Sequence, residues 1–199
     1  MTGFLKESKG FTLIELIVAM GIAVIVLGGV YTAYHSQQRS FMVQQDLVRM
    51  QQGLRSAAYY MEREIRMAGC DPTGDAGNAG IIAANATTIH FREDTRGNTE
   101  GSEPDGACDD PNEDIWYRLT DADGDGDNDL VRDTGGGNQI VAEDIDSLNF
   151  VYRDRNGNVT GVLANIRSVE ITIVATTNRF NRFHQRNLTT RIDCRNIGI

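Results

Sequence analysis

The sequence has little cysteine, and no two cysteines have the spacing of a metal or redox motif. Its three cysteines, Cys70, Cys108 and Cys194, lie far apart in the chain. The absence of a CxxC pair argues against a zinc ribbon and against a thioredoxin-type redox centre. Outside the cytoplasm, three cysteines predict one disulfide and one free thiol, and the alternative is three free thiols. The sequence gives no basis for choosing the pair.

Catalytic motifs are also missing. His35, His90 and His184 are scattered, and no Ser-His-Asp, HExxH or phosphate-loop spacing occurs in the chain. We therefore expect each histidine to be structural or solvated. The sequence predicts a protein that is not an enzyme.

Basic residues are outnumbered by acidic ones. The chain has 19 Lys and Arg against 28 Asp and Glu, a formal net charge of −9, and much of the acidity lies between Glu93 and Asp146. Such a surface repels phosphate backbones, which argues against a nucleic-acid partner and favours cations. A local basic and aromatic group could bind nucleic acid or an acidic partner, although we interpret it as a subunit contact or an ordinary loop: Arg179, Phe180, Arg182, Phe183 and Arg186.

Charge is nearly absent from the most apolar part of the chain. From Phe11 to Val30 the single charged residue is Glu15. About 20 residues at a rise of 1.5 Å span roughly 30 Å, the thickness of the bilayer core. This segment is expected to cross a membrane.

Proline is absent from Phe11 to Cys70, and the apolar positions that follow the membrane segment step by three or four. This spacing predicts a helix, with one face formed by Val43, Leu47, Met50, Leu54, Ala58, Met61, Ile65 and Ala68. One helix from about 11 to 68 would be on the order of 85 Å long, so its first half must pack against something other than this domain. Gly69 and Pro72 are expected to end it. We divide it into a membrane half, 11–30, and an amphipathic half, 31–69.

The remainder, residues 70–199, is expected to form a globular domain rich in β-strands. Turn residues separate short runs with β character, and Asn156-Gly157-Asn158 is typical of a hairpin turn. The expected strands are Gly80 to Arg92, Asp114 to Leu119, Leu130 to Asp133, Ile145 to Arg153, Val159 to Val162, Val169 to Thr176 and Asn187 to Cys194. Alternating apolar residues from Val169 to Ala175 favour antiparallel pairing. The fold class is α+β, a long N-terminal helix packed on a mainly antiparallel sheet.

A short polar segment precedes the apolar run. Residues 1–10 contain Lys6 and Lys9, whereas a secretory signal peptide would place its apolar region before the cleavage site. If the chain is cut after Gly10, the apolar helix stays on the mature protein. The basic leader favours the cytoplasmic side, which places the C-terminal domain outside the cytoplasm.

The residues from Lys9 to Leu16, KGFTLIEL, resemble the processing motif of type IV prepilins and type II secretion pseudopilins. The resemblance implies a type IV pilin-like fold and a membrane peptidase that cuts between Gly10 and Phe11 and methylates the amine of Phe11. It also implies an inner-membrane precursor, an inner-membrane assembly machinery, and other pilin subunits as partners in a periplasmic or extracellular filament. Gly10 suits a close approach of the peptidase because it has no Cβ.

Glu15 is the most informative residue of this motif. A carboxylate in an apolar membrane helix costs on the order of 2.5 to 3.5 kcal/mol, so it usually marks a function. In the family that the motif resembles, the matching glutamate pairs with the N-terminal amine of a neighbouring subunit and fixes the axial stagger of the filament. The alternative is a side chain that reaches the cytoplasmic headgroups.

Two further segments, Met61 to Gly69 and Val141 to Asp154, resemble PilW-type minor pilins and J-type pseudopilins. This resemblance implies a role in filament initiation or at the tip. A major pilin and a type II secretion pseudopilin are the alternatives. A calcium-dependent adhesin anchored in the membrane is the alternative from another class.

An acidic loop between two expected strands is a candidate calcium site. Its carboxylates alternate along the chain: Asp121, Asp123, Asp125, Asp127 and Asp129. With Gly126 at the turn, they resemble the first half of an EF-hand or dockerin loop, whose oxygen ligands suit calcium. Position twelve departs from that pattern because it is Arg132, and Asp133 comes one residue late. The alternative is a solvated acidic hairpin loop.

Overall fold

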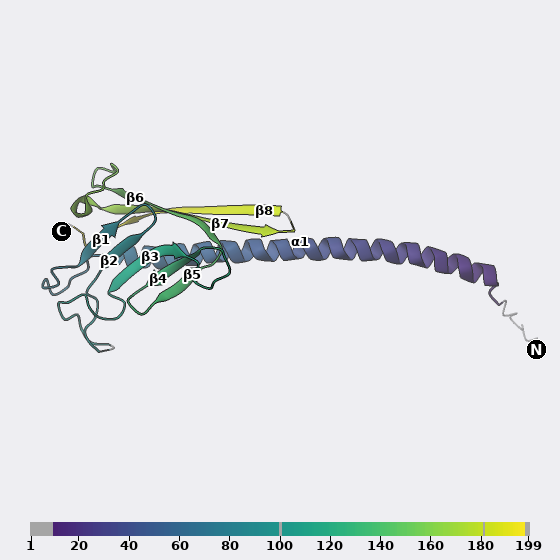
Figure 1. Cartoon of the computed structure of the whole chain (residues 1–199), viewed down its shortest axis with the longest axis horizontal. Helices are drawn as coiled ribbons and strands as arrows, with labels where there is room; N and C mark the ends of the chain where they lie inside the picture. Colours follow the sequence, from purple (N-terminus) through teal and green to yellow (C-terminus); the bar gives the residue numbers. More distant parts are fainter. Residues whose placement is uncertain (1–9, 100, 181, 198–199) are drawn as a thin grey trace, which may run out of the picture. The chain divides into compact units, whose positions relative to one another are not determined.

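The computed structural model describes residues 10–99, 101–180 and 182–197. The chain divides into two compact units, Met1–Gln45 and Asp46–Ile199, and the division falls within helix α1, Leu13–Met67 (Figure 1). The expected leader, 1–10, lies outside the described residues except for Gly10.

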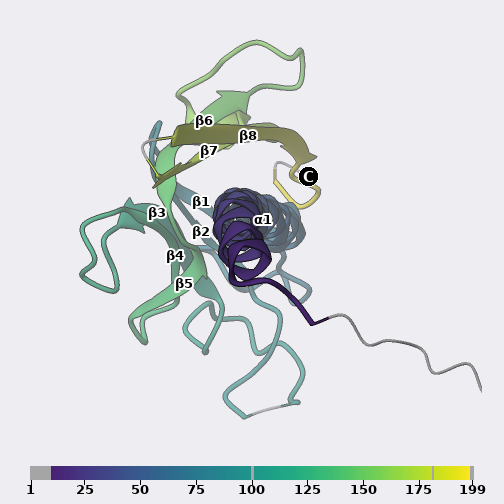
Figure 2. The same ribbon diagram turned by 90° about the vertical axis from the view of Figure 1, so that its right-hand side faces the viewer.

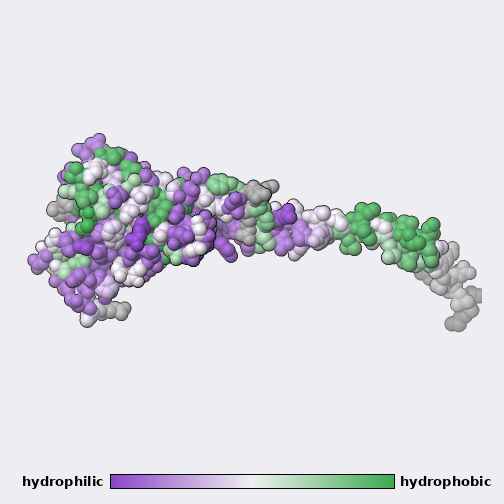
Figure 3. All heavy atoms as spheres, viewed as in Figure 1, coloured by the Kyte–Doolittle hydropathy of each residue, from purple (hydrophilic) through white to green (hydrophobic). Residues whose placement is uncertain are grey.

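The first unit contains the N-terminal part of α1. By its length and composition this helix is able to cross a membrane, and its most apolar stretch has no buried residue. Figure 3 shows hydrophobic residues gathered along this stretch. Exposed Leu, Ile and Val side chains on a helix require either lipid or other protein around them.

The end of α1 in the second unit agrees with the sequence. The helix ends at Met67, Gly69 has φ of +78°, and the Cys70 N–H donates to the Met67 carbonyl over 2.8 Å. A Cβ on Gly69 would lie 3.1 Å from the Asn196 carbonyl oxygen. Glycine is therefore required here both by the left-handed backbone and by the close approach of the C-terminal segment.

The first sheet of the second unit has five antiparallel strands in the order β1-β2-β3-β4-β5. They are β1, Gly80–Ala84; β2, Ile89–Arg92; β3, Asp114–Thr120; β4, Asp129–Asp133; and β5, Asn138–Ala142. The expectation of a single strand over Gly80 to Arg92 is wrong, because the Asn85 N–H donates to the Thr88 carbonyl and closes a hairpin. Strand β5 was not expected, because it is a short and mostly exposed edge strand without strong alternation.

The second sheet has three antiparallel strands in the order β6-β7-β8. They are β6, Ile145–Arg153; β7, Ser168–Arg179; and β8, Arg182–Asp193. The hairpin turn is confirmed, because the Asp154 carboxylate accepts the N–H groups of Asn156 and Asn158. The strand expected over Val159 to Val162 is wrong: Val159 forms one bridge with Arg153, and a short 3-10 helix, Leu163–Asn165, follows.

The two sheets lie on two sides of the second-unit part of α1 (Figure 2). Buried residues of the helix, and Ala68 just after it, form one core with both sheets: Leu54, Ala57, Met61, Ile65 and Ala68. Phe91 and Tyr117 face them from the first sheet, and Ile171 and Ile173 from the second. The structure is therefore an α+β fold with a type IV pilin-like architecture, as expected.

Candidate functional site

The expected cleavage site is open. Gly10 is exposed, a Cβ there would have no atom within 4 Å, and the Phe11 side chain is 92% exposed. The described residues place nothing of the chain itself over the Gly10–Phe11 bond. A peptidase could approach this bond without first displacing a packed segment.

Thr12 and Glu15 form a reciprocal capping box at the start of α1. The backbone N–H and the hydroxyl of Thr12 each donate to Glu15 Oε2 over 2.9 Å, and the Glu15 N–H donates to Thr12 Oγ1 over 3.3 Å. This is the S/T-x-x-E arrangement that satisfies free N–H groups at a helix start. The sequence contains this capping-box pattern as Thr12-Leu13-Ile14-Glu15, and the capping role of Glu15 was not predicted from it.

The capping box holds the Glu15 carboxylate at the positive end of the helix dipole. Phe11 directly precedes the box, so cleavage after Gly10 would create a new amine four residues before this carboxylate in the chain. The same carboxylate can thus serve two roles, a helix cap within one subunit and an anionic partner for an amine. These roles can be separated by substitution.

A buried ion pair fixes the end of α1 to the first sheet. Arg132 Nε donates to both carboxylate oxygens of Glu64 over 3.0 Å, and the Tyr117 hydroxyl donates to Glu64 Oε2. The side chains of Arg132 and Glu64 are only 11% and 14% exposed. Such a pair is tolerated in the interior because each charge has its partner and further hydrogen bonds.

Glu93 lies next to this pair in a cavity of about 850 Å³, which is also lined by Arg63, Glu64 and Arg132. Glu93 Oε2 is buried without a hydrogen-bond partner. Burial, and then the nearby charges of Glu64 and Glu113, raise the pKa of Glu93 to about 7, against a smaller effect of the two arginines. The native state therefore binds this proton more tightly than the unfolded chain does.

The raised pKa predicts that Glu93→Gln stabilises the protein at and above neutral pH. The contribution of the Glu93 proton to stability is complete below the unfolded pKa, near 4.5, and is lost as the pH rises to about 7. The free energy of unfolding of the variant should equal that of the wild type at pH 4 and should exceed it by on the order of 3 kcal/mol at pH 8. Urea unfolding followed by fluorescence of the single tryptophan, Trp116, measures it.

The control for this prediction is Glu103→Gln, since Glu103 is exposed. Its free energy of unfolding should follow that of the wild type at both pH values. A Glu93→Gln protein that gains no stability between pH 4 and pH 8 would show that Glu93 is already ionised at little cost.

The five aspartates of the acidic loop do not converge on one point. Their ligand oxygens form two groups, one with Asp121, Asp123 and Asp129 and one with Asp125, Asp127 and Asp144, each within 4.8 Å. Asp144 was missed because it comes from the turn between β5 and β6. Its approach depends on strand pairing and leaves no local sequence signal.

Neither residue near position twelve of this loop is available as a ligand. Arg132 binds Glu64, and Asp133 accepts a hydrogen bond from Arg118 over 2.9 Å. Within the loop, Asp121 accepts the N–H groups of Gly124 and Gly126. Calcium at Asp121 to Asp129 stays a prediction.

All three thiols are free in the structure. Burial, and then Glu113 and Asp94, raise the pKa of Cys108 to about 11, and burial raises that of Cys194 to about 12. Such thiols are poor nucleophiles at neutral pH. The disulfide expected from the sequence, one pair among the three cysteines, stays a prediction.

His90 is held by neighbours in the first sheet. Its ring stacks on Trp116 with centroids 3.8 Å apart, and it shares a hydrogen bond with Asp114. Burial alone would raise the pKa of Asp114, but the hydrogen bonds from Arg92 and His90 outweigh it and hold that pKa below its usual value. His35 lies on α1 against Tyr31, and His184 lies on β8. The described residues do not bring the three histidines together.

The expected basic and aromatic group maps to the β7–β8 hairpin. Phe180 and Phe183 are 49% and 65% exposed, and Arg186 is exposed on β8. The side chains of Arg179 and Arg182 lie outside the described part of the chain. Its interpretation as a subunit contact or an ordinary loop stays a prediction.

The comparison with protein families gives one match. The family described as the prokaryotic N-terminal methylation motif matches residues 5–31. The search of curated proteins found no match. The matched range contains Gly10, Phe11 and Glu15 together with the apolar start of α1.

This match and the fold support one class of protein. The motif supports a type IV pilin-like or pseudopilin subunit, which implies processing by prepilin peptidase and assembly with other pilin subunits. The motif together with the apolar helix fits a precursor anchored in the membrane and later assembled into pili. It indicates a structural rather than a catalytic protein.

Proposed function

We propose that this chain is a minor subunit of a type IV pilus or a related filament, cut between Gly10 and Phe11 and built in through the N-terminal part of α1. The observation that carries the proposal is one continuous segment that combines the open Gly10–Phe11 bond, Glu15 and an exposed apolar helix. In the membrane this helix contacts lipid. In a filament the same side chains would contact neighbouring helices.

The role of Glu15 in assembly follows from its chemistry. Once the chain is cut, a positive amine at Phe11 and a negative carboxylate four residues later lie on the same apolar helix. Opposite charges in an apolar core are tolerated when they pair. Pairing of the Glu15 carboxylate with the Phe11 amine of a neighbouring subunit would set the axial stagger of the two subunits. Before assembly, the carboxylate would stay in the capping box.

The minor-pilin assignment rests on two segments. Met61 to Gly69 forms the end of α1 with its glycine cap, and Val141 to Asp154 contains β6 and the start of the hairpin turn. Both resemble PilW-type minor pilins and J-type pseudopilins. We propose a place at filament initiation or at the tip.

The proportion of this chain in filaments tests the assignment. In filaments sheared from cells and measured by quantitative mass spectrometry, a minor subunit should be present at no more than a few per cent of the most abundant pilin. Equal or greater abundance would identify a major pilin. Absence from every filament fraction, with the chain kept in the membrane, would favour the anchored adhesin.

A further inference from the structure

The loop between β2 and β3 is held in place by two buried carboxylates. Glu113 is fully buried and accepts the N–H groups of Thr95, Arg96 and Asp110, at 2.8, 3.0 and 3.2 Å. Asp94 is also fully buried and accepts the Gly106 N–H over 3.0 Å. These bonds fix the backbone at the start of the loop, directly after Asp105, and at Asp110 itself.

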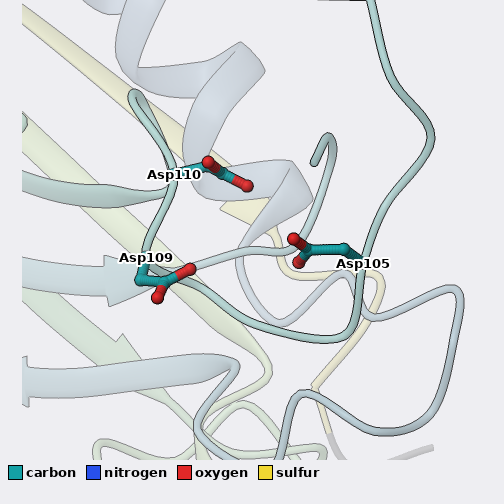
Figure 4. Close-up of side chains that lie close together, drawn as sticks. All are labelled: Asp105, Asp109 and Asp110. Carbon is teal, nitrogen blue, oxygen red and sulfur yellow. The ribbon is translucent and has the colours of Figure 1, made fainter. Parts of the chain in front are cut away.

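Three further carboxylates meet on this loop. One oxygen each from Asp105, Asp109 and Asp110 lies within 4.8 Å of the other two. Figure 4 shows the three side chains turned toward the space that they share. Asp105 and Asp109 are exposed, whereas Asp110 is only 7% exposed.

Asp110 carries an unpaired oxygen into this group. Its Oδ2 atom is buried and has no hydrogen-bond partner. Leaving a buried charged acceptor unsatisfied is costly, and such atoms are rare in native structures. The two acidic groups near residues 121–144 differ, because no described carboxylate of theirs has a buried oxygen left unpaired.

The surrounding charge is mainly negative. Asp110 experiences the negative charges of Asp105, Asp109 and Asp94, which Arg96 opposes. A bound cation would reverse this balance, since it would neutralise carboxylates that now repel one another.

We propose that Asp105, Asp109 and Asp110 form a calcium site in the β2–β3 loop. The donor set consists of oxygen atoms, which suits a hard cation. Cys108 is not among the residues whose ligand atoms gather here, so this group lacks the sulfur ligand that zinc and copper prefer. Calcium tolerates an irregular ligand shell, whereas magnesium requires a near-octahedral one.

Two of the three carboxylates border open space. Asp109 and Asp110, but not Asp105, line a cavity of about 590 Å³ together with Asn78, Gly135 and Gly136. Water in this space can complete the coordination shell that three carboxylates leave open. An open site of this kind in an extracellular module binds calcium with a dissociation constant on the order of 10⁻⁴ to 10⁻³ M. The site does not depend on the proposed filament role.

Calorimetric titration of the full chain in detergent, stripped of metal with a chelator, tests the site. Asp110→Asn keeps the shape of the side chain and should remove one bound calcium, or weaken it at least tenfold. Asp123→Asn is the matched control in the other acidic loop, and it should keep the site that depends on Asp110.

Asp110 is buried, so Asp110→Asn could also disturb folding. Asp105→Asn and Asp109→Asn avoid this problem because both positions are exposed, and each should weaken calcium binding at the same site. Calcium binding by Asp110→Asn with the number and affinity of the wild type would overturn the proposal. So would the absence of calcium heat in the wild type. Magnesium binding as tight as calcium binding would overturn the assignment of the ion.

Discussion

A chain with Gly10→Val should accumulate in the membrane as the uncut precursor. The peptidase must approach the Gly10–Phe11 backbone closely, and a branched side chain on the residue before the cut would block that approach. Among the described residues, a Cβ at Gly10 meets no atom within 4 Å. The substitution therefore acts on the peptidase rather than on the packing of the protein.

Gel electrophoresis of membrane fractions measures this effect. The variant should run at the size of the full 199-residue chain, while the wild type runs smaller by the residues of the leader. Gly21→Val is the matched control, because Gly21 lies in the same apolar helix and also has no atom within 4 Å of its Cβ site. Cutting of Gly10→Val at the wild-type rate would place the processing site elsewhere.

Glu15→Gln should be cut normally but should enter filaments at least tenfold less. Glutamine at this position still completes a capping box with Thr12, so the start of the helix is preserved. The charge that could neutralise the amine of a neighbouring Phe11 is lost, and that amine is left unpaired in an apolar core. A loss of about 1.4 kcal/mol per contact already corresponds to a factor of ten.

Thr12→Ala is the complementary variant. It removes the hydroxyl that binds Glu15, at a cost of about 1 kcal/mol to the helix start, but leaves the carboxylate in place. Immunoblots of sheared filaments should show Thr12→Ala near the wild-type level and Glu15→Gln strongly reduced. The opposite order would mean that Glu15 acts as a helix cap and not as an ionic partner.

Much of the fold could be predicted because its signals are local. The three- and four-residue steps from Val43 to Ala68 predicted α1, and the alternation from Val169 to Ala175 predicted the centre of β7. The ends of β7 and β8 could not be predicted. Their outer pairs, such as Asn178 with Phe183, are stabilised by strand pairing rather than by an apolar pattern.

The candidate sites divide in the same way. Gly10, Phe11 and Glu15 lie close together in one short motif and were accessible from the sequence. The unusual states of Glu93 and Asp110 were not accessible, because burial by residues distant in the chain produces them. The alternating aspartates of the 121–129 loop form a regular pattern that predicts a calcium site. The group with an unpaired buried oxygen lies in the 105–110 segment, where the carboxylates have no regular spacing.

The mass of the N-terminal peptide tests the central claim most directly. Mass spectrometry of the protein purified from membranes should find a chain that begins at Phe11 and carries an N-methyl group. This result would show that the chain with the matched motif over residues 5–31 undergoes the cleavage and methylation that the motif implies. A chain that still begins at Met1 would contradict processing and assembly, and would leave α1 as a plain membrane anchor.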